Sequence, residues 1–118
     1  MSTPIGPYTP VVRAGDWLVV SGQLGLHDGA LVHGGVGDEV RQALANMAAL
    51  LEGQGAGLAQ VVKTTVFLRH ISDYAVMNEA YTAAFGDHRP ARAAVAVADL
   101  PLSALVEIEA WAYLGPQQ

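Results

Sequence analysis

The sequence predicts an α+β fold in which two helices pack on one face of a mixed β-sheet. Apolar residues between positions 38 and 51 recur with the period of an α-helix, and a second helical period runs from residue 74 to residue 85. The segments around these helices are short and rich in β-branched residues, which is typical of strands. Residues 1–118 are expected to form one domain, because a chain of this length buries enough surface for only one core.

The N-terminal third is predicted to form short strands joined by tight turns. Val11 to Arg13 and Trp17 to Ser21 flank a turn at residues 14–16, which indicates a hairpin whose second strand ends at Gly22. A further turn at residues 27–29 precedes a short strand from Ala30 to His33.

The two helices are predicted with their ends and their buried sides. The first begins at Asp38 as its N-cap and ends at the glycines that start with Gly53. The second is capped by Ser72 or Asp73 and ends at Gly86. The residues expected to face the core are Val40, Ala43, Leu44, Met47, Leu50 and Leu51 in the first helix and Tyr74, Met77, Tyr81, Ala84 and Phe85 in the second.

Three strands are predicted in the second half of the chain. Residues 61–68 are almost continuously β-branched or apolar, which favours a central position in the sheet. Arg92 to Val97 and Leu105 to Tyr113 follow the second helix, separated by a loop that is expected to contain only a turn at Asp99 to Pro101.

The last two strands each place charged side chains among apolar ones. Because side chains alternate between the two faces of a strand, Glu107 and Glu109 share a face with Trp111, whereas Ile108 and its even-numbered neighbours take the other. Arg92 likewise shares its face with the small residues Ala94 and Ala96. This pattern fits either a structural ion pair or a pocket in which Arg92 binds a carboxylate and a glutamate handles a proton or a water.

Composition and charge exclude several classes of function. The net charge is −5 and the six Lys and Arg residues are scattered, so nucleic-acid binding is not expected. The chain has no Cys, which excludes disulfides and thiolate chemistry, and its four His residues lack the spacing of a metal site, so no metal is expected. No secretory signal or membrane-spanning run is visible, and a cytoplasmic protein without membrane contact is expected.

The hydrophobic fraction is high for so short a chain. At 52% hydrophobic and 14% charged residues, a monomer would expose a sizeable apolar patch. A homo-oligomer is therefore expected.

Six dispersed blocks of the sequence resemble the RidA/YjgF family, whose members have also been called L-PSP endoribonucleases. They occur in the order and near the spacing of that family and cover residues 5–113. The blocks are Ile5 to Tyr8, Ser21 to Gln23, Val62 to Leu68, Asn78 to Tyr81, Pro90 to Arg92 and Glu107 to Ala110.

The resemblance implies a fold, an assembly and an activity. The fold would be chorismate-mutase-like and the assembly a homotrimer with pockets between subunits. The activity would be hydrolysis of enamines and imines such as 2-aminoacrylate and 2-iminopropanoate to a 2-keto acid and ammonia. No cofactor is expected, because a protonated imine is already electrophilic and needs mainly a held substrate and a poised water.

The resemblance also implies roles for individual residues. Arg92 would bind the substrate carboxylate and Glu107 would position or activate water, although the shared strand face leaves Glu109 as an alternative to Glu107. Tyr8 would close one wall of the pocket, and Ser21 and Asn78 would support its loops. Gly22 and Ala94 complete the set near the pocket; Ala94 stands where many members have Cys or Thr, which excludes side-chain chemistry there and leaves the substrate open.

Two other functions are compatible with this fold. A ribonuclease would need a basic groove, which an acidic chain does not supply. A non-catalytic protein that binds small carboxylates, including 2-keto acids, would keep Arg92 but show no turnover.

Overall fold

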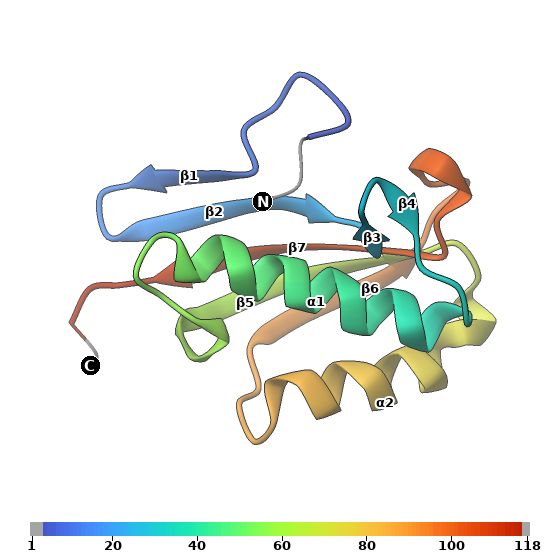
Figure 1. Cartoon of the computed structure of the whole chain (residues 1–118). Coiled ribbons are helices and arrows are strands. Elements are labelled where there is room, and N and C mark those ends of the chain that lie inside the picture. Colours follow the sequence, from blue (N-terminus) through green and yellow to red (C-terminus); the bar gives the residue numbers. More distant parts are fainter. Residues whose placement is uncertain (1–3, 117–118) are drawn as a thin grey trace.

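The structure is a computed structural model that describes residues 4–116, and it has two helices on one face of a mixed sheet, as the sequence predicts (Figure 1). The main sheet has the strand order β1-β2-β7-β5-β6, in which β5 and β6 are parallel and the other neighbours are antiparallel. Its strands are Val11–Ala14 (β1), Trp17–Gln23 (β2), Val61–Leu68 (β5), Ala91–Ala96 (β6) and Val106–Tyr113 (β7). The helices are Val36–Glu52 (α1) and Tyr74–Phe85 (α2).

A small hairpin and three short 3-10 turns connect these elements. The hairpin consists of Leu26–His27 (β3) and Ala30–Leu31 (β4). Its turn has positive φ at both Asp28 and Gly29, the conformation that a two-residue hairpin favours. The 3-10 turns are Leu58–Gln60, Ile71–Asp73 and Pro101–Ser103.

The hydrophobic core lies between the two helices and one face of the sheet. All six residues of the stripe predicted for α1 are buried, with exposed fractions between 0% and 6%. They pack against the even-numbered residues of β7 and against Leu18, Val20 and Val66 of the neighbouring strands. The opposite face of the sheet carries no helix (Figure 1).

The predicted N-cap of helix α1 was wrong, whereas Asp73 as the N-cap residue of α2 and the helix ends at Gly53 and Gly86 were confirmed. Helix α1 begins at Val36, after Gly35, so Asp38 lies in the first turn, where its carboxylate pairs with Arg41. Gly35 has a φ of 92°, which a glycine adopts without steric cost, and this lets the helix start before the aspartate. Helix α2 follows Asp73, but no side chain caps it.

The predicted inward face of α2 was partly wrong. Met77, Tyr81 and Phe85 are buried, whereas Tyr74 and Ala84 are exposed and Ala80 is buried in their place. Tyr74 is the first residue of the helix, where it lies beside the edge strand β6 and beyond the core. The helical period gives the right side of the helix but not where along its length the core ends.

Two strand predictions also need correction. The segment at residues 61–68 is internal, between β7 and β6, but the central strand is β7. Strand β2 continues through Gly22 to Gln23, with an irregular register against β7 between Val20 and Gln23. The backbone is therefore extended at Gly22, and the glycine does not end the strand.

No helix within residues 4–116 is both long enough and apolar enough to span a lipid bilayer.

Candidate functional site

A cavity of about 450 Å³ opens on the helix-free side of the sheet, beside the irregular part of β2. It contains four of the residues predicted from the sequence to be near a site, together with apolar neighbours from three loops. Its lining is Ile5, Gly6, Pro7, Tyr8, Ser21, Gly22, Leu24, Pro101 and Glu107. The residues from the two ends of the chain are thus brought together by the pairing of β2 with β7.

Ser21 anchors the N-terminal strap, which we define as residues 4–10, to the sheet. Its backbone N–H donates to the carbonyl oxygen of Pro10 at 2.8 Å, and its hydroxyl donates to the carbonyl oxygen of Thr9 at 2.7 Å. The hydroxyl is therefore engaged in holding the strap, and the strap in turn carries Tyr8 to the rim of the cavity.

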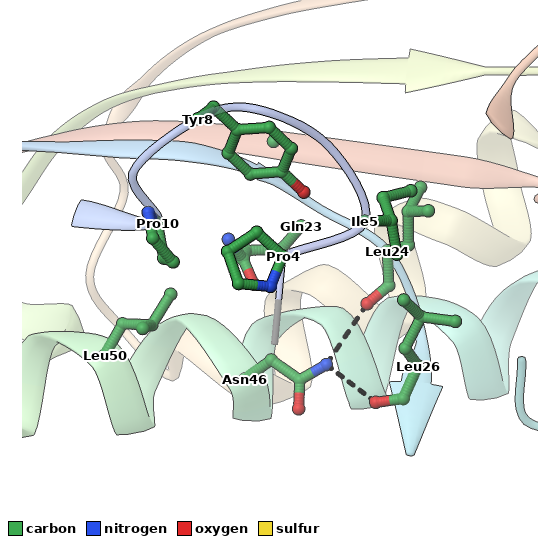
Figure 2. A pocket seen from close by; sticks show the side chains of 10 residues that line it. Pro4, Ile5, Tyr8, Pro10, Gln23, Leu24, Leu26, Asn46 and Leu50 are labelled. Carbon is green, nitrogen blue, oxygen red and sulfur yellow. Dashed lines mark hydrogen bonds between the residues drawn. The ribbon is translucent and has the colours of Figure 1, made fainter. Parts of the chain in front are cut away.

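The other side of the strap covers a much smaller cavity of about 40 Å³ next to helix α1 (Figure 2). There Asn46 donates from its Nδ2 atom to the carbonyl oxygens of Leu24 and Leu26, at 3.2 and 2.9 Å. Tyr8 and Ile5 line both cavities. The strap is thus the wall between the two spaces.

Among the described residues that line the larger cavity, Glu107 is the only ionisable side chain apart from Tyr8. A Cβ atom at Gly22 would collide with its carboxylate, so a larger residue there would displace the Glu107 side chain from its present position. Burial raises the pKa of Glu107 above its ordinary value, and the neighbouring Glu109 raises it further. Glu109 does not line the cavity, so of the two acids that the sequence left open, Glu107 is the one at this site.

Arg92 lies on the other face of the sheet, against helix α2. Its Nη2 atom donates to the hydroxyl of Tyr74 at 3.1 Å, and its Nη1 atom lies 3.8 Å from the sulfur of Met77. The guanidinium also stacks on Tyr81, with 4.9 Å between Cζ and the ring centroid. Among residues 4–116 this guanidinium forms no ion pair.

Asn78 and Ala94 lie on the same side of the sheet as Arg92. Ala94 is half-buried and packs against the core. The Oδ1 atom of Asn78 is buried and has no hydrogen-bond partner among the described residues. A buried amide oxygen without a donor is uncommon, because such a group loses its water without compensation.

The residues predicted from the sequence therefore form two separate groups within one protomer. Arg92 is the register partner of Thr64, which is buried beneath the helices, whereas Glu107 is the partner of Phe67 on the helix-free face. Side chains on opposite faces of one sheet cannot contact the same small molecule. One chain alone does not bring Arg92 and Glu107 together.

The histidines and acids give no metal site in the part of the chain that the structure describes, since no group of three or more His, Asp or Glu side chains lies together there. His27, His33 and His70 are exposed. The ring of His88 instead lies 2.6 Å from the carbonyl oxygen of Val61, where it joins the loop after α2 to the start of β5.

Sequence reasoning missed one residue next to Arg92, which is Tyr74. The helical period assigned this tyrosine to the core, whereas 42% of it is exposed. The available signal was its position as the first residue after the predicted cap, since the first turn of a helix often projects past the layer that it covers.

Comparison with known proteins agrees with this fold. A sequence model of the family described as Endoribonuclease L-PSP matches residues 1–114. The human 2-iminobutanoate/2-iminopropanoate deaminase is 46% identical over 114 residues, which cover 95% of this chain and 83% of that protein. A RutC family protein of Pyrococcus horikoshii is 46% identical over 112 residues, covering 93% of this chain and 89% of the relative.

Solved structures give the same result. The crystal structure of RidA from a Psychrobacter species superimposes with a TM-score of 0.90 at 39% identity, covering 94% of this chain and 91% of that one. The crystal structure of E. coli TdcF with bound serine has a TM-score of 0.90 at 34% identity, covering 95% and 91% of the two chains. With a family match over nearly its whole length and relatives above 40% identity, the chain belongs to the RidA/YjgF family, also described as endoribonuclease L-PSP.

Proposed function

We propose that this protein hydrolyses imines of small 2-keto acids, of the 2-iminopropanoate type, to the 2-keto acid and ammonia. The observation that carries the proposal is a pair of groups: a guanidinium with no acidic partner among the described residues, and a carboxyl of raised pKa in a cavity. The names of the human, mouse and rat relatives, each 2-iminobutanoate/2-iminopropanoate deaminase at 45% or 46% identity, support the same chemistry.

Arg92 is assigned to the substrate carboxylate. A guanidinium keeps its charge at any physiological pH and presents N–H groups in a planar fork that matches a carboxylate. Because no acid within residues 4–116 neutralises it, its charge is available to an anionic ligand.

Glu107 is assigned to the proton transfers. In its ionised form it accepts a proton from water as the water oxygen bonds to the carbon of the protonated imine, giving a neutral carbinolamine. The protonated acid then returns that proton to the nitrogen. The C–N bond breaks as the ionised carboxylate takes the hydroxyl proton, so that ammonia leaves and the keto group forms, and the acid then passes this proton to the ammonia or to water. The raised pKa of Glu107 favours its protonated form more than that of an exposed glutamate, and this form can also serve the tautomerisation of 2-aminoacrylate to the imine by donating to its methylene carbon.

A pocket that contains both Arg92 and Glu107 requires a second copy of the chain. We therefore assign the assembly as a homotrimer with pockets between subunits. The helix-free face of the sheet supports this, since it exposes large apolar side chains that a second protomer would cover. Their exposed fractions are 37% for Trp17, 44% for Val95, 45% for Trp111 and 47% for Val12. In such an assembly Arg92 of one subunit would face the Glu107 cavity of the next.

The remaining residues are given supporting roles. Tyr8 closes the cavity wall, Ser21 holds the strap that carries Tyr8, and Gly22 leaves room for the Glu107 carboxylate. Asn78 has a buried amide oxygen that is free to accept a hydrogen bond from a partner subunit or a ligand. Ala94 offers only its backbone.

The test is turnover of 2-aminoacrylate generated in the assay by a serine dehydratase, with ammonia release followed above the uncatalysed rate. Arg92→Ala and Glu107→Gln are each expected to abolish the protein-dependent rate while the assembly stays intact. Removing a general base or acid of this kind typically costs about 10²-fold to 10⁴-fold in rate.

Matched controls separate this chemistry from general damage. Arg13→Ala removes an exposed guanidinium whose hydrogen bond within residues 4–116 is to the carbonyl of Gly15, and it should leave the rate unchanged. Glu109→Gln removes the acid next to Glu107 on the same strand face, and it should keep most of the activity. Saturable 2-keto acid binding without turnover in the wild type would instead indicate a non-catalytic carboxylate-binding protein. RNA cleavage that persists after repurification would instead indicate a ribonuclease.

A further inference from the structure

Tyr74 is the first residue of helix α2, and the residue is 42% exposed beside the edge strand β6. Its oxygen accepts a hydrogen bond from Nη2 of Arg92 at 3.1 Å. The ring centroid lies 5.6 Å from the guanidinium carbon, a distance at which a cation is attracted to an aromatic ring. Tyr74 therefore contacts Arg92 through both its hydroxyl and its ring.

The guanidinium is held from its other sides by buried groups. Tyr81 is 4% exposed and lies beneath it at 4.9 Å, and the hydroxyl of Tyr81 is 2.7 Å from that of Thr64, which is 0% exposed. Met77, also 0% exposed, meets Nη1 through its sulfur. Because Tyr81 and Met77 are packed in the core, they restrain the guanidinium beside the Tyr74 hydroxyl.

The proton of the Tyr74 hydroxyl is uncommitted. The oxygen receives its hydrogen bond from Arg92, and within residues 4–116 no acceptor lies in hydrogen-bond reach of the hydroxyl. A hydroxyl that accepts from a cation becomes a better donor, because the two hydrogen bonds polarise one another. An anion arriving at Arg92 thus meets a second donor next to the guanidinium.

We propose that Tyr74 is a substrate-binding residue whose O–H donates to one oxygen of the ligand carboxylate while Arg92 binds the carboxylate alongside it. This proposal rests on the proposed function, since it concerns the same carboxylate subsite. Because the donors of Arg92 and Tyr74 lie side by side, the subsite should prefer a ligand with two adjacent anionic oxygens. An amide or ester at that position would offer only one strong acceptor and would bind less well.

The test compares Tyr74→Phe with the wild type, since phenylalanine keeps the ring and removes only the hydroxyl. Binding of 2-ketobutanoate, the stable product analogue, is measured by calorimetry, and KM and kcat are measured with the imine substrate. Loss of one hydrogen bond is expected to raise Kd and KM by about fivefold to tenfold. The value of kcat should change by less than about twofold, because the interaction is equally present in the ground and transition states.

Two further variants separate the role of Tyr74 from the proposed function. Tyr113→Phe removes a tyrosine hydroxyl at the far end of β7, where the ring lies 4.9 Å from that of Trp17, and it should leave Kd unchanged. Arg92→Ala should abolish 2-ketobutanoate binding. If Arg92→Ala weakens binding but Tyr74→Phe does not, the role of Tyr74 is overturned and the proposed function stands.

The opposite results are equally informative. If Arg92→Ala leaves Kd unchanged, the proposed carboxylate subsite itself is wrong. If Tyr74→Phe lowers kcat or the thermal midpoint and leaves Kd and KM unchanged, Tyr74 serves the structure and does not bind the ligand.

Discussion

The two faces of the central strand β7 have opposite properties. Val106, Ile108, Ala110 and Ala112 are each 0% exposed beneath the helices, whereas the alternating residues Glu107, Glu109 and Tyr113 are half-buried and Trp111 is exposed. One strand of eight residues therefore supplies the middle of the core with one set of side chains and a candidate site with the other. The hydrophobic core and the candidate site thus draw on alternate residues of the same segment.

The helix-free face itself is divided along its length. At one end the rings of Trp17 and Trp111 lie 6.0 Å apart and those of Trp17 and Tyr113 lie 4.9 Å apart. At the other end the same face carries Glu107 and Glu109. Clustered aromatic rings are typical of a protein interface, whereas a desolvated acid next to a cavity is typical of a reactive site.

The largest effect is expected from a charge placed in the aromatic end of this face. Trp111→Lys removes an exposed ring from the proposed subunit interface and puts a cation in its place. A central aromatic residue contributes about 2 kcal/mol or more to an interface, so the assembly should dissociate to monomers and turnover should fall to background. Sedimentation equilibrium measures the assembly, and circular dichroism confirms that the monomer stays folded.

A matched substitution on helix α2 tests whether assembly depends on the helix-free face of the sheet. Val76 lies on the outer side of α2 and is 52% exposed, so Val76→Lys introduces the same charge away from the sheet. It should leave the oligomeric state unchanged. An assembled Trp111→Lys variant, or a dissociated Val76→Lys variant, would contradict the assignment of the helix-free face as the interface.

A smaller effect, on stability and not on assembly, is expected from a substitution on the helix-covered face of the sheet. Ile108→Ala leaves a cavity in the core between β7 and the helices, so the free energy of unfolding should drop by about 2–5 kcal/mol. The oligomeric state and KM should change little at temperatures where the variant is folded. Chemical denaturation at fixed protein concentration measures the loss, and a loss below that of Glu109→Ala would contradict the assignment of the two faces.

Much of the fold could be predicted, because the spacing of apolar residues along a helix or a strand indicates which side of that element is buried. The apolar stripe of α1 and the alternation along β7 were both correct, since each depends only on which neighbours are buried. The position of Asp38 was not predictable in this way, because Gly35 at positive φ starts the helix earlier than a side-chain cap would.

The candidate site was predictable in its members more than in its arrangement. The cavity contains Tyr8, Ser21, Gly22 and Glu107, which the family resemblance had brought together. No period or spacing indicates that Arg92 lies on the opposite face from Glu107 within one chain, because that depends on strand order and register. Tyr74 was misassigned for the related reason that exposure at a helix end depends on where the neighbouring sheet stops.

The smallest expected effect concerns Glu39, a buried acid of α1 that is hydrogen-bonded to the segment between the cavity rim and β7. Glu39 in α1 is 5% exposed, and its carboxylate accepts a hydrogen bond from the backbone N–H of Leu105 at 2.9 Å. Leu105 follows the turn that carries Pro101 to the cavity and directly precedes β7. Burial raises the pKa of Glu39 above its ordinary value of 4.5, and the nearby Asp73 adds to the rise.

A raised pKa in the folded state means that folding favours the protonated acid. The stabilising contribution of Glu39 is therefore complete below its unfolded pKa and is lost as the pH rises through its folded pKa. Glu39→Gln keeps an acceptor for Leu105 but cannot ionise, so the free energy of unfolding should depend less on pH from 4.5 upward and should not fall at neutral pH. Glu39→Ala leaves the Leu105 N–H without a partner and should cost about 1–3 kcal/mol at low pH, where Glu39 is protonated, and less as the pH rises and the wild type loses its own stabilisation. Denaturant unfolding across this range measures both variants, and a pH dependence in Glu39→Gln as steep as that of the wild type would show that another group causes it.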